Sequence, residues 1–128
     1  MQKDRNDARK YREAANEGDV MAMNNLGVCY HTGKGVVENH ATAFQWYMKA
    51  ALLDDVYACY NVAECYYKGD GVGQDFEKAN FWYLKAANKG DMQSQVNLAN
   101  AYYLGEGIEK NHEKANQWWL EAAWQGHV

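Results

Sequence analysis

A repeat of 36 residues runs through the chain and limits its possible folds more than any other feature. The same residue type returns at this spacing at many positions, as in Asp19, Asp55 and Asp91. Other matching sets are Tyr30, Tyr66 and Tyr102; Trp46, Trp82 and Trp118; the glycine pairs Gly33/Gly35, Gly69/Gly71 and Gly105/Gly107; and the alanine pairs that begin at Ala50, Ala86 and Ala122. The sequence therefore predicts a single domain, 1–128, built from a half repeat (1–18) and repeats 19–54, 55–90 and 91–126.

Composition narrows the functional classes. Hydrophobic residues make up 48% of the 128 residues, but no apolar run is long enough to cross a membrane or to serve as a secretory signal. The net charge is −4, and residues 13–128 hold 8 basic against 15 acidic residues. A nucleic-acid surface needs a basic stripe, so the repeats argue against one. We expect a cytoplasmic protein, with export as an effector left open.

The three cysteines are expected to be free thiols. Cys59 and Cys65 lie six positions apart on one predicted helix, roughly 9 Å along its axis and beyond disulfide reach. Cys29 and Cys65 are equivalent residues of adjacent repeats, matched by Ala101, which indicates small core residues.

Each repeat reads as a helix, a glycine turn, a second helix and a tight turn. Aspartate N-caps predict first helices over 20–32, 56–68 and 92–104, and Asn39, Asp75 and Asn111 open second helices over 40–53, 76–89 and 112–125. A helix over 4–17 completes the half repeat, for seven helices in total. The fold class predicted is all-α, an α-solenoid of antiparallel helix pairs, which suits a chain without proline.

The two sides of the first helices differ between repeats. One side stays apolar, as at Leu26, Val62 and Leu98, which is what stacking requires. The opposite side changes freely, for example from Asn24 to Tyr60. A side that varies in this way is free for binding.

These residues resemble the Sel-one-like repeat family, relatives of tetratricopeptide repeats. The first repeat carries the family pattern at Ala22, Asn25-Leu26-Gly27, Tyr30, Gly33, Gly35-Val36, Ala43, Trp46-Tyr47 and Ala50-Ala51, with Asp54 where glycine is usual. The resemblance implies a right-handed superhelix whose first helices line a concave surface. It also implies a scaffold or adaptor module, bacterial here, that binds proteins or peptides.

The candidate binding residues are those that this arrangement places on the concave surface. They are Met21, Asn24, Asn25, Val28, His31, Tyr57, Tyr60, Asn61, Glu64, Lys68, Gln93, Val96, Asn97, Asn100 and Tyr103. Tyrosines offer contact area at low entropic cost, and amides can bond a peptide backbone. For Tyr57, Tyr60 and Glu64 partner contact is favoured. The recurring Asn25, Asn61 and Asn97 fit a structural ladder and a peptide clamp equally well.

Motifs for other chemistry are incomplete, so we expect no enzyme, cofactor or metal site. Gly33-Lys34-Gly35 follows a helix and lacks a third glycine, so a positive-φ turn is favoured over a nucleotide loop. The sequence from His112 to Asn116 lacks the second histidine of a zinc-protease motif. The one serine, Ser94, occupies an alanine position, and a hydrolase acting on β-lactams or peptides is the least favoured alternative.

The C-terminal end carries Trp118, Trp119 and Trp124 without a polar capping helix. Either the chain is a slice of a longer solenoid or this end self-associates.

The sequence as a whole favours a scaffold that binds a protein segment on its concave surface. An immunity or inhibitor protein for a single toxin or enzyme is the nearest alternative.

Overall fold

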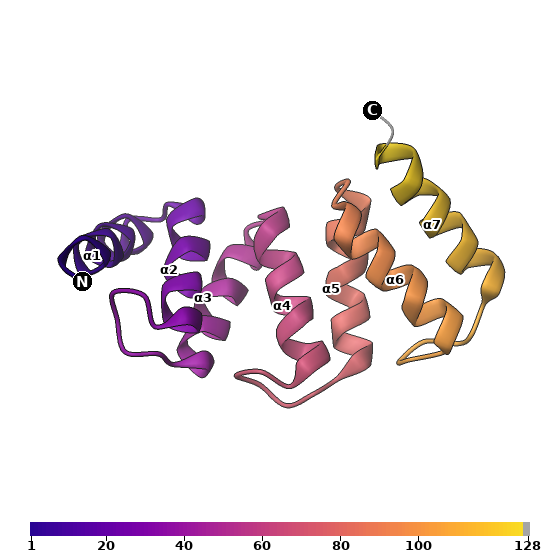
Figure 1. The fold of residues 1–128 in the computed structure, drawn as a ribbon, viewed down its shortest axis with the longest axis horizontal. Coiled ribbons are helices and arrows are strands. Elements are labelled where there is room, and N and C mark those ends of the chain that lie inside the picture. Colours follow the sequence, from indigo (N-terminus) through magenta and orange to yellow (C-terminus); the bar gives the residue numbers. More distant parts are fainter. Residues whose placement is uncertain (127–128) are drawn as a thin grey trace.

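The computed structural model describes residues 1–126, which form seven α-helices and, within that range, no strand. The helices are α1 (Gln2–Asn16), α2 (Val20–Thr32), α3 (His40–Leu52), α4 (Val56–Lys68), α5 (Phe76–Asn88), α6 (Met92–Leu104) and α7 (His112–Gly126). They follow one another in a curved row that has α1 and α7 at its opposite ends (Figure 1). The predicted α-solenoid is confirmed, and each helix ends within two residues of its predicted position.

Side-chain caps set where the helices begin. The carboxylate of Asp55 accepts a hydrogen bond from the backbone N–H of Ala58 at 2.9 Å, and Asp19 and Asp91 do the same at α2 and α6. Asn39, Asp75 and Asn111 cap α3, α5 and α7 with equivalent bonds of 2.9–3.0 Å. Each cap satisfies a backbone donor that has no partner inside its helix.

Glycines end the first helices and dock the turns. Gly33, Gly69 and Gly105 close α2, α4 and α6 in the left-handed conformation, with φ of 75°, 69° and 73°. Two residues on, Gly71 has φ of 75° and lies so close to α3 that an added Cβ would be 2.2 Å from the carbonyl oxygen of His40. The glycines therefore serve turn geometry and close approach, as predicted.

The core runs along the whole row. Each extensive contact between helices joins neighbours in the sequence, from α1·α2 to α6·α7. Leu26, Val62 and Leu98, the equivalent residues of the three first helices, are at most 1% exposed. Burial of this face against both neighbours is what holds one repeat to the next.

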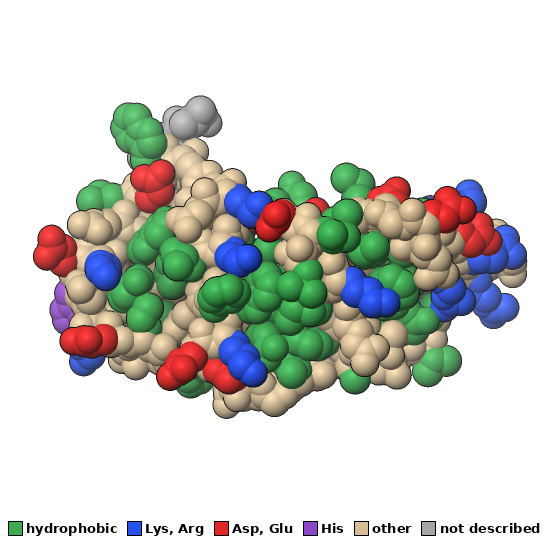
Figure 2. All heavy atoms as spheres, turned by 180° about the vertical axis from the view of Figure 1, so that it is seen from behind, with side chains coloured by type: hydrophobic (Ala, Val, Ile, Leu, Met, Phe, Trp, Pro, Cys, Tyr) green, Lys and Arg blue, Asp and Glu red, His purple; other side chains and the backbone are tan. Residues whose placement is uncertain are grey.

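The second helices present a surface on which lysine stems cover aromatic rings. Lys49 Nζ lies 4.4 Å from the ring centroid of Trp46, and Lys85 Nζ lies 5.3 Å from that of Trp82. On the face opposite to that of Figure 1, hydrophobic side chains run along the middle of the molecule with separate basic side chains among them (Figure 2).

Candidate binding groove

Three adjoining hollows form a groove across α2, α4 and α6, which we call the inner groove. The first hollow, about 400 Å³, lies between α2 and α4. The second, about 260 Å³, shares Tyr60 and Asn61 with the first. The third, about 450 Å³, shares Glu64 and Lys68 with the second and extends to α6. Because neighbouring hollows share side chains, the groove is continuous over all three repeats.

Most of the candidate binding residues meet in the inner groove. The first hollow is lined by Met21, Asn24, Asn25, Tyr57, Tyr60 and Asn61. The second adds Val28, His31, Glu64 and Lys68, and the third adds Asn97, Asn100 and Tyr103. Gln93 and Val96 also lie on α6 but line none of these three hollows.

Glu64 stands at the centre of a polar network in the groove. Its carboxylate accepts hydrogen bonds from Tyr83 Oη at 2.5 Å and from Asn97 Nδ2 at 3.4 Å, and it pairs with Lys68 Nζ at 3.1 Å. Burial raises the pKa of Tyr83, and the neighbouring carboxylate raises it further. Glu64 therefore holds α4, α5 and α6 together, whatever further contact it makes.

The asparagines bond between repeats. Asn61 Nδ2 donates to Asn24 Oδ1 at 2.9 Å across α4 and α2, and Asn97 reaches Glu64 across α6 and α4. These bonds support the structural interpretation of Asn61 and Asn97. Among residues 1–126 the amide nitrogen of Asn24 and the carbonyl oxygen of Asn61 have no side-chain partner, so both are open to a ligand.

Several side chains project from the groove, and three of them offer large apolar or aromatic surfaces. Met21, Tyr57 and Tyr103 are 68%, 65% and 43% exposed. Tyr103 is stacked on His112, with ring centroids 4.4 Å apart. Tyr60, by contrast, is half-buried. Burial raises the pKa of its hydroxyl group, and the nearby carboxylate of Glu64 raises it further.

The sequence-based prediction missed groove residues that come from the second helices. Tyr47, Tyr83 and Trp119 occupy equivalent positions of α3, α5 and α7, and each lines a hollow of the inner groove. The 36-residue spacing was a signal that could have found them. Trp119, expected at a possible association surface of the C-terminal end, lines the groove instead, where its Nε1 donates to Asn100 Oδ1 at 3.3 Å.

The other two C-terminal tryptophans also differ from each other. Trp118 is half-buried against the core and lines a separate hollow with Ala87 and Gln95. Trp124 is 73% exposed on α7. Only Trp124 therefore offers a widely exposed ring at this end.

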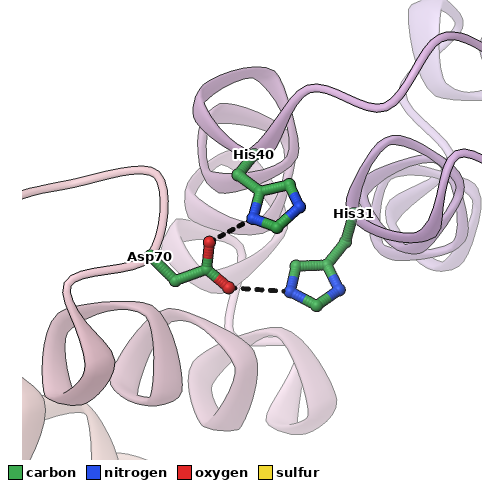
Figure 3. A group of neighbouring side chains, drawn as sticks. All are labelled: His31, His40 and Asp70. Carbon is green, nitrogen blue, oxygen red and sulfur yellow. Dashed lines mark hydrogen bonds and ion pairs between the residues drawn. The ribbon is translucent and has the colours of Figure 1, made fainter.

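A cluster of two histidines and an aspartate lies at the edge of the groove. His31 at the end of α2 and His40 at the start of α3 both contact the carboxylate of Asp70, which follows α4 (Figure 3). His31 Nε2 is 2.9 Å from Asp70 Oδ2, and His40 Nε2 is 2.6 Å from Glu38 Oε2. The hydrogen bonds to Asp70 and Glu38 raise the pKa of His40. Burial raises the pKa of Asp70, but the bonds to His31 and His40 outweigh it, and the net shift is downward.

Groups that suggest nucleophilic chemistry are engaged elsewhere. The hydroxyl of Ser94 is buried and donates to Asp91 Oδ2 at 2.5 Å, at the cap of α6. The three cysteines are free and buried, and burial raises the pKa of Cys65 to about 12. A thiol with so high a pKa is a poor nucleophile, which agrees with its predicted role as a core residue.

These features define an α-helical repeat protein with a continuous inner groove. The chain belongs to the Sel1 repeat family, whose sequence profile matches residues 20–55, 56–91 and 93–127. The repeats of this family commonly mediate protein–protein interactions and typically form non-enzymatic scaffolds. Within residues 1–126, no helix combines the length and apolar character needed to span a membrane.

Solved structures with the same fold include three bacterial proteins. One is c5321, a protective antigen present in uropathogenic Escherichia coli strains, with a TM-score of 0.92 and 35% identity over 93% of this chain and 26% of its own. A Sel1 repeat protein from Oxalobacter formigenes has a TM-score of 0.89 and 30% identity over 93% and 49%. Helicobacter pylori cysteine rich protein B has a TM-score of 0.72 and 26% identity over 93% and 90%.

This chain thus spans about a quarter and about half of the first two relatives. Among curated protein sequences, none matches it with significant similarity.

Proposed function

We propose that this chain is a protein-binding module that holds a segment of a partner protein in the inner groove. The observation that carries the proposal is the continuity of the groove across three repeats, with aromatic and amide side chains along it. Tyrosine supplies contact area at low entropic cost, and free amide groups can bond an extended backbone. Binding of this kind gives the domain a scaffold role, which requires no cofactor.

The groove residues divide into a floor and a contact set. Glu64, Asn61 and Asn97 are already bonded to neighbouring helices, so they form a rigid floor. Met21, Tyr57 and Tyr103 project into solvent and are free to contact a partner. Truncating Met21 or Tyr57 removes exposed area, and truncating Tyr103 removes exposed area together with its stacking on His112. These residues are better probes than the half-buried Tyr60 or than Glu64, whose bonds join three helices.

The alternatives differ in affinity or in chemistry. An immunity or inhibitor protein would use the same groove but bind one partner at nanomolar affinity, whereas a scaffold binds several partners more weakly. A hydrolase would need a nucleophile, and the hydroxyl of Ser94 is committed to Asp91. The likeness to a protective antigen of E. coli keeps an exported location open beside the cytoplasmic one.

The test uses a photo-crosslinking amino acid at Tyr57 or Tyr103, with a control at Phe81. Phe81 lies on α5 and is 54% exposed, comparable with Tyr103. The captured partner is identified, purified and titrated against the wild type, Tyr57→Ala/Tyr103→Ala and Phe81→Ala.

We expect crosslinks from the two groove positions. We also expect at least tenfold weaker binding by the double variant, since an aromatic anchor contributes about 1–3 kcal/mol or more. Crosslinking from Phe81 at an equal level, or unchanged affinity of the double variant, would place the site outside the groove.

The exposed face of α7 supports a separate proposal of weak self-association. Leu120 and Trp124 are 70% and 73% exposed on this helix. A Trp124→Gln variant should sediment as a monomer at concentrations where the wild type forms a dimer. A wild-type mass that stays monomeric at every concentration would remove this proposal.

A further inference from the structure

Three side chains at the junction of the first two repeats bring atoms that can ligate a metal close together. One atom each from His31, His40 and Asp70 lies within 4.8 Å of the others. The three residues come from α2, α3 and the turn after α4, and their side chains converge (Figure 3). We propose that this cluster binds one divalent transition-metal ion, Zn²⁺, with water as the fourth ligand.

The hydrogen-bonding pattern of His40 calls for a cation. Nε2 faces the carboxylate of Glu38 at 2.6 Å, while Nδ1 faces the carboxylate of Asp70. Ionised carboxylates only accept hydrogen bonds. When Nε2–H donates to Glu38, either a proton or a metal ion must therefore lie between Nδ1 and Asp70. With the metal there, Glu38 fixes the tautomer and the orientation of the ring, as carboxylates do for histidine ligands.

Zinc binding requires the nitrogen and oxygen atoms that now face one another to move apart. Ligands about 2.0–2.2 Å from a tetrahedral zinc ion are roughly 3.3 Å apart. His31 Nε2 and Asp70 Oδ2 are 2.9 Å apart, and the whole set spans at most 4.8 Å. The side chains of His31, His40 and Asp70 are 41%, 36% and 25% exposed, so they can rotate and admit water. Two imidazoles and one carboxylate form a donor set that zinc accepts.

The equivalent junction between the second and third repeats shows which features of the cluster follow from repeat packing alone. There Tyr67 and Phe76 occupy the positions of His31 and His40, with ring centroids 5.1 Å apart, and Tyr67 Oη donates to Glu106 at 3.2 Å. The rings of His31 and His40 lie 4.7 Å apart and are stacked, with an interplanar angle of 27°, whereas Tyr67 and Phe76 are tilted by 42°. Repeat packing thus brings two rings and a carboxylate together at both junctions. Only the first junction provides imidazole nitrogens in place of a phenol and a phenyl ring.

The turn that carries Asp70 is held in place independently of the cluster. Gly71 lies directly on the backbone of His40, so the neighbouring carboxylate is positioned before any ion binds. A bound ion would join the first repeat to the second. It would also stiffen the inner groove, because His31 and Asp70 both line its second hollow. Binding to the folded state alone raises stability by mass action.

The experiment titrates ZnCl₂ into tag-free, chelator-treated protein by calorimetry and repeats the titration with Co²⁺ by visible absorption. The first variant, His31→Tyr/His40→Phe, copies the chain's own second junction. The second, Asp70→Asn, removes the carboxylate alone. The control, His112→Phe, replaces a histidine of α7 with the residue found at the equivalent Phe76. Circular dichroism establishes that each protein is folded.

We expect one Zn²⁺ per wild-type chain at micromolar affinity, and binding at least tenfold weaker in both cluster variants. The His112→Phe protein should bind Zn²⁺ with the affinity of the wild type. Zn²⁺ should raise the Tm of the wild type and of His112→Phe, but not that of the cluster variants. Absence of zinc binding by the wild type overturns the proposal, as does equal binding by the histidine double variant. Should that variant not fold, unchanged binding by Asp70→Asn overturns it.

Discussion

The repeat geometry depends on the glycine turns, which pack against the backbone of the preceding repeat. A substitution at Gly71 tests this contact. An alanine at position 71 meets two obstacles. It must adopt φ of 75°, and its Cβ would lie 2.2 Å from the carbonyl oxygen of His40, where no carbon atom fits. Because the obstructing atom belongs to the backbone of α3, the turn has to move away from the preceding repeat.

Two other glycines separate these effects. Gly18 has φ of 98° but open space around its Cβ position, so Gly18→Ala measures the conformational strain alone. Gly73 has open space and no positive φ, so Gly73→Ala measures neither. The left-handed conformation costs an L-residue about 1–2 kcal/mol. The reduced entropy of the unfolded chain returns about 0.4–1 kcal/mol.

We therefore expect Gly73→Ala, which keeps only the entropy gain, to raise the free energy of unfolding by about 0.4–1 kcal/mol, and Gly18→Ala to lower it by about 1 kcal/mol. Gly71→Ala should lower it by about 3 kcal/mol, because a displaced turn also loses packing against α3. Urea unfolding followed by circular dichroism gives all three values. If Gly71→Ala differs from Gly18→Ala by less than about 0.5 kcal/mol, the turn does not dock as described.

Three further predictions concern single side chains. Asp54 has φ of 69°, and the equivalent residues of the other repeats are Gly18 and Gly90. Urea unfolding should show that Asp54→Gly stabilises the fold by up to about 1 kcal/mol and that Gly90→Asp destabilises it by a similar amount. Tyr83→Phe removes a hydrogen bond to the carboxylate of Glu64 and should lower the free energy of unfolding by about 1.5 kcal/mol, whereas Tyr57→Phe should leave it unchanged. Equal effects of the two substitutions would refute the polar network around Glu64. Burial raises the pKa of Tyr47 and Tyr83 above the ordinary 10.0, so these groups leave stability unchanged below pH 10 and reduce it as the pH rises further. Alkaline titration of tyrosinate absorbance should show both ionising only on unfolding, and ionisation of all tyrosines near pH 10 in the folded protein would contradict this.

The sequence predicted the helices closely because local signals mark their ends. An aspartate or asparagine cap opens six of the helices, and a left-handed glycine closes each first helix. The variable side of the first helices likewise pointed to the inner groove, since stacking holds the other side apolar. These signals lie within one repeat, where spacing alone determines which residues share a face.

The missed features depend on contacts between different helices. His31 and Asp70 are 39 positions apart, and they meet only because Gly71 docks on α3. Tyr83 reaches Glu64 from the second helix of the same repeat, through the gap between two first helices. No periodicity within one helix reports such a contact. Comparison of equivalent residues across the three repeats could have found Tyr47, Tyr83 and Trp119, but not the role of Asp70.

Hydrogen–deuterium exchange of the chain with its identified partner tests the central claim most directly. The inner groove is formed mainly by α2, α4 and α6, and the opposite surface by the outward sides of α3 and α5. Our account predicts that partner binding slows exchange in α2, α4 and α6 and leaves the solvent-facing amides of α3 and α5 unchanged. Slowed exchange confined to α3, α5 or the end of α7 would contradict it and place the binding surface outside the groove.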